Sequence, residues 1–284
     1  MKKGEVYEGI IEQIEFPNKG KVVVDGQTVI VKNGMPGQKV RFMINKKRGG
    51  RVEARLLEVL EPSPLETRKP VCSIFPQCGG CMYQTMDYSH QLEMKQEQIR
   101  RLLDTAIKNG GQVDENGNPD YVFEGIKGSP TEFCYRNKME FSFGDEVKDG
   151  PLSLGMHKRG SFHDIVTVDA CRIMDSDFRN ILLATLDYFT HSGVPFYKKM
   201  AHTGYLRHLL VRKAKKTQEI LVDIVTTSQL DERHESELMD GYAALIAAMA
   251  LDGRIEGKLA GVLHTVNDSL ADVVQSDRTD VLWG

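Results

Sequence analysis

A chain of 284 residues with 40% hydrophobic and 27% charged side chains has an ordinary globular composition, which excludes a disordered or fibrous chain. No stretch of about 18 apolar residues is present and the first residues lack an apolar signal core, which argues against a membrane-spanning or secreted protein. We therefore expect a cytoplasmic protein of two or three domains with no membrane partner.

Charge is distributed unevenly along the chain, although the net charge is only -3. Residues 1–60 contain 12 Lys and Arg against 7 Asp and Glu, an excess of five positive charges. A second basic run extends from Lys198 to Lys216 with no acidic residue before Glu219. Such segments are typical of a polyanion partner, although a solvated charged surface is the alternative.

The first sixty residues read as short strands separated by turns that contain Gly and Asn, which tolerate the positive φ of tight turns. The predicted strands lie at residues 6–16, 21–24, 28–31, 40–45 and 51–60. Short strands in a small basic unit predict an all-β barrel of the OB type, whose surface suits nucleic acid. A barrel that binds no ligand is the alternative.

Residues 61–110 are predicted to contain a linker, a cysteine loop and a helix. The linker EPSPLETRKP has three prolines in ten residues, which disfavours helix and sheet. Apolar spacing predicts the helix over residues 89–108, with Asn-Gly-Gly as its stop. Residues 111–284 alternate strands with two further helices, which predicts an α+β domain. Its clearest elements are helices at 175–193 and 231–251 and strands at 205–212, 219–226 and 259–266.

Three of the five cysteines stand in the segment VCSIFPQCGGCMYQ, with the spacing C-x5-C-G-G-C at Cys72, Cys78 and Cys81. In a reducing cytoplasm, clustered cysteines favour a metal site over disulfides. Structural zinc sites usually present two close pairs of ligands, whereas three neighbouring cysteines and a distant fourth favour a [4Fe-4S] cluster. Gly79 and Gly80 would let the backbone approach such a cluster. A zinc site and unrelated buried cysteines are the alternatives.

The fourth ligand has two candidates. Cys171 follows a predicted strand, where a turn can direct it toward the cysteine segment, and we predict that it is the ligand. Cys134 lies at the start of a strand, a position typical of a small packed cysteine.

Several motifs together carry a family resemblance: the basic N-terminal domain, the cysteine motif with Gln84, and the segments YRNKMEFSF, LGMHKRGSF and DACRI. With them the chain resembles the RNA (uracil-5-)-methyltransferases, in the branch that acts on 23S rRNA and carries a TRAM domain and a [4Fe-4S] cluster. The resemblance implies a TRAM domain at residues 1–60 and a central RNA-recognition domain at 111–284. It also implies these cluster ligands: Cys72, Cys78, Cys81 and Cys171.

In that family a cysteine thiolate adds to C6 of a flipped uracil, whose C5 then takes a methyl group from S-adenosylmethionine. A Rossmann-like donor site would show a motif such as D/E-x-G-x-G-x-G, which this sequence lacks. Cys134 alone remains as a nucleophile once four cysteines are assigned to the cluster. We therefore expect no catalytic or donor-binding residue here, and a chain that is inactive alone.

The expected fold class is an OB-like barrel followed by an α+β domain with the cluster loop, with the methyltransferase domain missing. The expected partner is RNA, most simply ribosomal RNA, and not DNA. A tRNA methyltransferase and a stand-alone RNA-binding or redox-sensing iron-sulfur protein are the alternatives.

Basic residues on neighbouring predicted strands are candidates for RNA contact, with aromatic side chains nearby for base stacking. The basic candidates are Arg136, Lys138, His157, Lys158, Arg159 and Arg207, and the aromatic candidates are Phe141, Phe143 and Phe162. The alternative is that the aromatic rings belong to the core and the charges are merely solvated. His163, His202 and His234 show no ligand spacing and are interpreted as structural or solvated.

Overall fold

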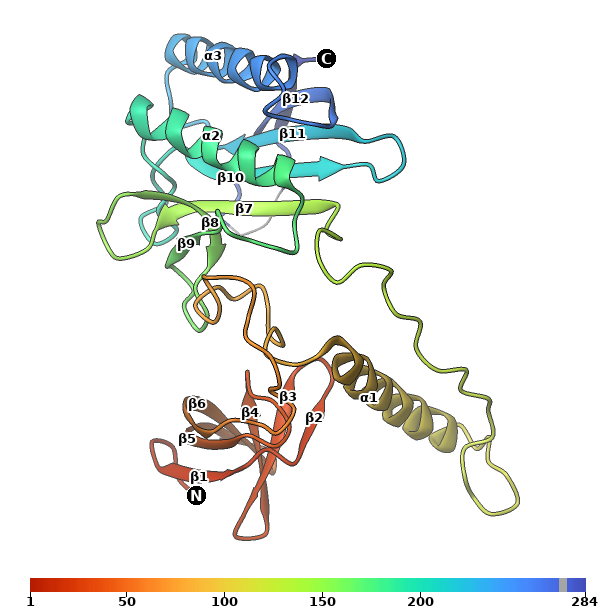
Figure 1. Ribbon diagram of the computed structural model, residues 1–284. Helices are drawn as coiled ribbons and strands as arrows, with labels where there is room; N and C mark the ends of the chain where they lie inside the picture. Colours follow the sequence, from red (N-terminus) through yellow and green to blue (C-terminus); the bar gives the residue numbers. More distant parts are fainter. Residues whose placement is uncertain (271–274) are drawn as a thin grey trace. The chain divides into compact units, whose positions relative to one another are not determined.

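The computed structural model describes residues 1–270 and 275–284 (Figure 1). They form two compact units, each assembled from two segments of the chain. Unit 1 comprises Met1–Pro70 and Met82–Pro130, and unit 2 comprises Val71–Cys81 and Thr131–Gly284. Among the described residues, no helix has the length and apolar character needed to cross a membrane.

Unit 1 is built on a six-stranded sheet with the strand order β1-β5-β6-β4-β3-β2. Its strands are β1 (Val6–Ile10), β2 (Gln13–Glu15), β3 (Lys19–Val24), β4 (Gln27–Lys32), β5 (Lys39–Arg48) and β6 (Arg51–Glu61). Neighbouring strands are antiparallel except β4 and β6, which run parallel. The β3–β4 turn consists of Asp25 and Gly26, both with positive φ, which matches the twist of a two-residue hairpin.

The core of unit 1 consists of alternate strand residues that face inward, among them the fully buried Val22, Val29 and Phe42. Helix α1 (Tyr88–Asn109) follows the strands in this unit. Its one buried residue is Gln98, whose Nε2 donates a hydrogen bond to the Ile14 carbonyl over 3.4 Å. Met94 of the helix also packs against the core of unit 1, but much of the helix's apolar face is exposed.

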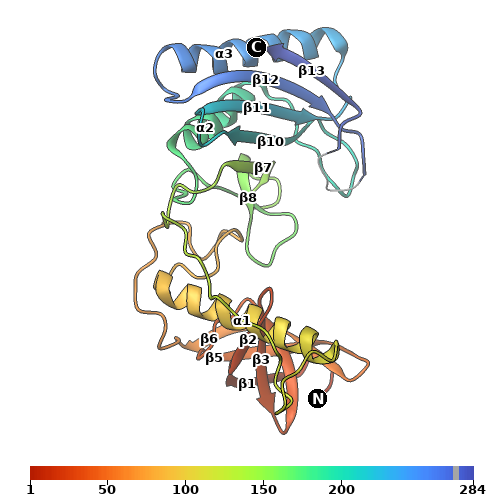
Figure 2. The ribbon, with the colours of Figure 1, turned by 90° about the vertical axis from the view of Figure 1, so that its right-hand side faces the viewer.

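Unit 2 contains a seven-stranded sheet with the order β13-β12-β11-β10-β7-β8-β9 (Figure 2). Its strands are β7 (Lys138–Asp145), β8 (Leu152–His157), β9 (Ile165–Thr167), β10 (Leu206–Lys213), β11 (Glu219–Thr226), β12 (Lys258–Val266) and β13 (Arg278–Trp283). Strands β11 and β12 are parallel, and helix α3 (Glu232–Leu251) connects them as a crossover. The other neighbouring strands are antiparallel.

Helix α2 (Ser176–Ser192) and helix α3 share one buried apolar cluster with alternate residues of β7, β10, β11 and β12. The hydroxyls of Thr185 and Tyr242 lie 2.9 Å apart between the two helices. The Asp175 carboxylate caps α2 by accepting from the Asp177 amide, and Gly193 ends the helix with a φ of 70°. Both helices thus cover the same face of the sheet.

A buried ion pair fixes the start of α2 to the sheet. The ammonium of Lys213, at the end of β10, lies 2.7 Å from the Asp177 carboxylate and 3.1 Å from that of Asp175. The Asp177 carboxylate also accepts the amides of Glu256 and Gly257, just before β12. One carboxylate therefore joins three elements that are distant in sequence.

The predicted fold class is wrong. The chain is not an all-β barrel followed by an α+β domain, because both sheets are mixed and α1 belongs to unit 1. The described residues form a mixed-sheet α/β fold with two sheets and few helices, and nothing in it shows that a methyltransferase domain is missing. The turn residues in the sequence predicted where the strands lie. Which strands pair with each other depends on contacts between distant segments, and a local sequence pattern does not contain that information.

Candidate functional site

The cysteine loop, residues 71–81, belongs to unit 2 and is held against the end of β8 by the backbone. The Gly79 amide donates to the His157 carbonyl over 2.9 Å, and the Arg159 amide donates to the Gln77 carbonyl over 2.6 Å. The segment after β8, which the sequence suggested for RNA contact, is therefore also the support of the cysteine loop.

The two glycines of the loop have different surroundings. A Cβ on Gly79 would lie 3.0 Å from the His157 carbonyl oxygen, so this position tolerates no side chain without a shift of backbone. A Cβ on Gly80 would meet the Cys78 sulfur at an ordinary 3.5 Å. The Gly80 amide instead donates to the Cys78 sulfur over 3.3 Å. Gly79 therefore serves close packing, and Gly80 supplies a hydrogen bond to a thiol.

Cys78 and Cys171 each interact electrostatically with Cys81 and Cys72. Burial raises the pKa of the Cys78 thiol, and so do the charges of Cys81 and Cys72. Burial also raises the pKa of the Cys171 thiol; the amides of Ile173 and Met174 oppose this rise, and the charges of Cys81 and Cys72 add to it. The structure thus brings the four cysteines predicted as ligands into one neighbourhood.

Cys134 does not share this neighbourhood. Its side chain is exposed, and its backbone has a φ of 52°. Its sulfur contacts the Arg172 carbonyl oxygen at 3.8 Å. The prediction that Cys134 is a packed core residue is therefore wrong.

Arg159 places a positive charge beside the thiols. Its Nε donates to the Pro76 carbonyl over 2.9 Å, and a terminal nitrogen donates to the Cys81 carbonyl. Its guanidinium also lies 5.5 Å from the centre of the Phe75 ring. Burial lowers the pKa of this guanidinium, and the charges of Cys78 and Cys81 oppose that effect. Arg159 is thus a part of the cysteine loop's support.

The donor chemistry of this neighbourhood suits a soft metal centre, because thiolates are the ligands that such centres prefer. None of the described cysteines forms a disulfide. Within residues 1–270 and 275–284, no group of three or more His, Cys, Asp or Glu side chains is arranged to hold one metal ion.

Arg136 and Lys138 are exposed at the beginning of β7, as expected for an RNA-contacting surface. Lys138 forms an ion pair with Glu140 at 3.3 Å, and Lys158 forms one with Glu146 at 3.8 Å. Arg136 and Lys138 therefore lie at the beginning of β7, whereas the Lys158 side chain reaches Glu146, just after the end of that strand. Their contact with RNA stays a prediction.

Arg207 lies elsewhere and is only 4% exposed. Its guanidinium donates to the carbonyl oxygens of Asn267 and Ser269, each over 2.7 Å. It also lies 4.5 Å from the centre of the Tyr197 ring. These contacts indicate that Arg207 holds the segment after β12, and its predicted contact with RNA is untested.

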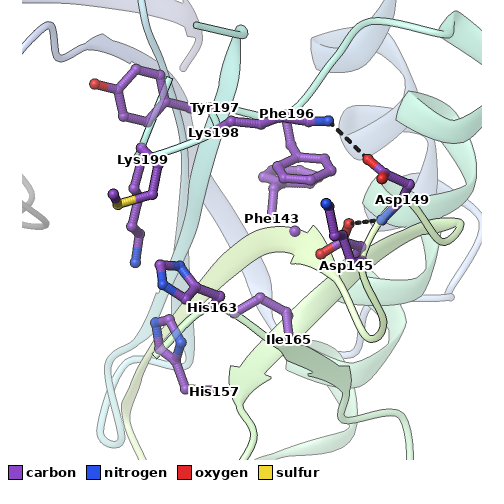
Figure 3. A pocket seen from close by; sticks show the side chains of 13 residues that line it. Phe143, Asp145, Asp149, His157, His163, Ile165, Phe196, Tyr197, Lys198 and Lys199 are labelled. Atoms are coloured by element: carbon purple, nitrogen blue, oxygen red, sulfur yellow. Dashed lines mark hydrogen bonds and ion pairs between the residues drawn. The ribbon is translucent and has the colours of Figure 1, made fainter. Parts of the chain in front are cut away.

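A pocket of about 280 Å³ opens in unit 2 between the β7–β8 region and the segment before β10 (Figure 3). Its lining combines aromatic, cationic, imidazole and carboxylate side chains. The residues that Figure 3 labels are Phe143, Asp145, Asp149, His157, His163, Ile165, Phe196, Tyr197, Lys198 and Lys199.

The sequence had suggested only some of this pocket. Phe143 and His157 were candidates for RNA contact, and Lys198 and Lys199 begin the second basic run. His163 had been interpreted as structural or solvated, although it lines the pocket. The sequence offered no reason to select Asp145 or Phe196 as site residues, because nothing near them in the sequence shows that a pocket forms there. Of the other two aromatic candidates, Phe141 is fully buried, whereas Phe162 is 64% exposed.

The chain is similar along its whole length to proteins named as RNA methyltransferases. It is 45% identical to an "Uncharacterized RNA methyltransferase" of Clostridium tetani and 42% identical to one of Clostridium acetobutylicum, in each case over 284 residues. A third relative, from Caldanaerobacter subterraneus subsp. tengcongensis, is 39% identical. All of this chain is covered, but it spans only 58% of the length of these relatives. No model of a known protein family matches the chain.

The fold is also found in a solved structure. The crystal structure of Pyrococcus abyssi tRNA (uracil-54, C5)-methyltransferase in complex with S-adenosyl-L-homocysteine matches with a TM-score of 0.60 and 20% sequence identity. The match covers 96% of this chain and 55% of that protein. At this identity the comparison establishes a shared fold.

Proposed function

We propose that this chain, which is related in sequence to RNA methyltransferases, forms the RNA-recognition part of an S-adenosylmethionine-dependent RNA (uracil-5-)-methyltransferase. The observation that carries the proposal is the 45% identity to an RNA methyltransferase relative along all 284 residues. The uracil specificity is supported by the resemblance of the cysteine motif and of the segments around β7 and β8. It is supported further by the fold shared with an enzyme whose name specifies uracil C5.

The methyl donor of the proposed reaction is S-adenosylmethionine, whose demethylated product is bound in the structural neighbour. We assign no nucleophile, base or donor-binding residue within this chain. Its proposed contribution is to bind and orient the RNA. The exposed Arg136 and Lys138 at the beginning of β7 and the half-buried Lys158 after β8 supply phosphate contacts for that purpose.

The class of RNA is part of the proposal. The family resemblance favours 23S rRNA, whereas the structural neighbour's name specifies tRNA. Deleting the gene and mapping 5-methyluridine by mass spectrometry in purified rRNA and tRNA decides between them. We expect 5-methyluridine to be lost at one position of 23S rRNA. Loss of 5-methyluridine at a tRNA position would show that the substrate is tRNA. Unchanged 5-methyluridine in both RNAs would refute the proposed reaction.

We further propose that Cys72, Cys78, Cys81 and Cys171 hold a [4Fe-4S] cluster. The charges of Cys72 and Cys81 act on both the Cys78 and the Cys171 thiol, which supports this assignment. In such a cluster each thiolate binds a different iron atom, so the cluster does not require the compact donor group of a single ion. When bound, the cluster would crosslink the loop 71–81 to the segment before α2, which is a structural role.

Iron and sulfide analysis of protein purified without oxygen tests the cluster. We expect about four iron atoms and four sulfides per chain and a brown colour. Cys171→Ser should lose the colour, and Cys134→Ser is the matched control that should keep it. Colourless protein, or protein with a single zinc ion, would refute the cluster without affecting the RNA proposal.

A further inference from the structure

The pocket of Figure 3 has the size and lining of a site for one nucleotide. Its volume of about 280 Å³ lies near the lower limit of small-molecule sites, which suits a ligand as small as a single base with its sugar. It is also open to solvent on the surface of unit 2, where a polymer can reach it. We propose that this pocket binds the base of one RNA nucleotide that is turned out of its strand, and that this base carries an amino group.

The aromatic residues of the pocket provide the apolar surface that a base requires. Figure 3 shows the rings of Phe143 and Phe196 at the centre of the pocket. Phe143 is 6% exposed and fixed in the core, where its ring packs edge-on against Phe189 at 5.7 Å. Phe196 is less buried, and the Lys198 ammonium lies 5.8 Å from the centre of its ring. Unstacked RNA bases bind to aromatic faces of this kind.

The carboxylates on one side of the pocket decide which base fits. The Asp145 carboxylate accepts the Asp149 amide over 2.8 Å, which orients it, and the Asp149 carboxylate lies 3.4 Å from the Lys198 ammonium. An ionised carboxylate only accepts hydrogen bonds. Guanine, adenine and cytosine present amino groups as donors, whereas uracil presents two carbonyl groups and a single N–H. The carboxylate side therefore favours an amino-bearing base over uracil.

A lysine and a histidine on the opposite side can hold the phosphate of the same nucleotide. Lys199 and His163 line that side in Figure 3. The Lys199 ammonium lies 4.8 Å from the centre of the exposed Phe162 ring, which itself stacks on His157 at 6.2 Å. A strand leaving the pocket would thus meet a cation and then an exposed aromatic face, the combination typical of single-stranded RNA binding.

The inference rests on the proposed function, because RNA is the source of the nucleotide. It also extends that function: a pocket that disfavours uracil does not hold the uridine that is methylated. The bound nucleotide is therefore a second one, and its capture would place the RNA relative to the methylated position.

Binding of free nucleotides to the 284-residue chain tests the pocket directly. Met200 lines the pocket and is 83% exposed, so its methyl group, labelled with ¹³C, is a local NMR probe. We expect GMP, AMP and CMP to shift this signal, with an affinity about tenfold above that of UMP, as one base-specific contact provides. Ribose 5-phosphate should have little effect. Equal shifts by UMP, or by ribose 5-phosphate, would overturn the proposal, and so would no shift at all.

Two substitutions with matched controls sharpen this test. Asp145→Asn replaces an acceptor by a group that also donates, so the preference for GMP over UMP should fall by about tenfold. Lys199→Ala should weaken binding of all four nucleotides alike. The controls are Asp187→Asn and Lys216→Ala, which change exposed residues outside the pocket and should leave both properties unchanged. The assignment would be refuted if the Asp145→Asn variant unfolds like the original chain and keeps the same preference for GMP over UMP.

An RNA oligonucleotide with single abasic positions separates this inference from the proposed function. If both hold, one abasic position should weaken binding about tenfold and abolish the Met200 shift. If the chain binds RNA equally well with every abasic position, the pocket proposal fails and the RNA proposal stands. If free nucleotides bind but no oligonucleotide does, RNA is not the source of the nucleotide and the proposal in its stated form is overturned.

Discussion

The Nε of Arg159 donates a hydrogen bond to the carbonyl oxygen of Pro76 over 2.9 Å, so a residue from the end of β8 holds the cysteine loop. The same guanidinium contacts the Cys81 carbonyl, on the other side of Cys78. From the sequence Arg159 was a candidate for RNA contact. Two of its donors are directed at the loop, which assigns it a role in positioning the cysteines, and its contact with RNA stays a prediction.

Replacing Arg159 by Gln should therefore reduce the iron content of protein purified without oxygen, because the loop loses two carbonyl contacts and a nearby positive charge. Lys158→Gln is the matched control, since Lys158 pairs with Glu146 and does not contact the loop through a hydrogen bond of its side chain. The control should keep its iron and lose part of its RNA affinity. Equal iron content in both variants would contradict the role of Arg159.

Gly79→Ala should destabilise unit 2, whereas Gly80→Ala should be tolerated. The new methyl group at Gly79 would meet the His157 carbonyl oxygen at 3.0 Å, but at Gly80 its nearest neighbour lies at 3.5 Å. Overpacking of this kind costs about 1–3 kcal/mol of unfolding free energy. Urea unfolding of the two variants measures the difference. Equal unfolding midpoints would contradict the prediction, because they would mean that the loop moves to accommodate the methyl group at Gly79 without loss of stability.

Asp177→Ala should be strongly destabilising. The Asp177 carboxylate is 0% exposed and neutralises the Lys213 ammonium at 2.7 Å. Removing one partner of a buried ion pair costs about 3–5 kcal/mol, because the other charge stays buried. Arg233→Ala removes a partner from the exposed pair with Glu237 and should cost less than about 1 kcal/mol. Similar losses in both variants, measured by urea unfolding, would contradict this assignment.

The stability of the chain should fall between pH 7.5 and pH 5.5 in part because of His264. This side chain is 2% exposed, and its Nε2 lies 2.8 Å from the Thr226 hydroxyl. Burial lowers the pKa of His264 below its ordinary value of 6.5; Glu235 and Asp280 oppose this effect, and Arg278 adds to it. The unfolded chain therefore binds the proton more readily, so the stabilisation is complete only well above about pH 6.5 and is lost as the pH falls through that value.

His264→Gln should flatten this dependence, as measured by urea unfolding at three pH values. His191→Gln changes an exposed histidine on α2 and should leave the dependence as it is. A pH profile of His264→Gln that is identical to that of the original chain would exclude His264 as its source.

The tip of the β5–β6 hairpin should contribute to RNA affinity through charge. Lys46, Arg48 and Arg51 are exposed there. Each phosphate contact adds about one to the slope of log affinity against log salt, so changing all three residues to Ala should lower that slope by about two to three. Lys39→Ala is the control, because Glu61 already neutralises Lys39 at 2.9 Å. An unchanged slope in the triple variant would exclude the hairpin from the RNA contact.

Local patterns predicted the individual elements well. The helix expected at residues 89–108 is α1 (Tyr88–Asn109), and the strand expected at 219–226 is β11 (Glu219–Thr226). Apolar periodicity and capping residues carry this information within a few neighbouring positions. The parallel pairing of β11 with β12 was not predicted, because it depends on how α3 packs between them. The fold class was therefore wrong although most elements were right.

The same distinction applies to the site. The cysteine spacing was visible because three cysteines lie within ten positions, whereas the contacts of the loop with His157 and Arg159 were not. The pocket was not visible, since Asp145, His163 and Phe196 come from three separate segments. The burial of Arg207 was not visible for a related reason: its partners Asn267 and Ser269 lie some sixty positions later in the chain.

Neither unit is one continuous stretch of chain, because residues 71–81 belong with 131–284 while 82–130 belong with 1–70. A single proteolytic cut or a single recombination point therefore cannot release or exchange either unit intact. An expression clone that begins at Thr131 would omit the cysteine loop. Any genetic shuffling that transmits unit 2 whole has to carry two separate pieces of coding sequence together.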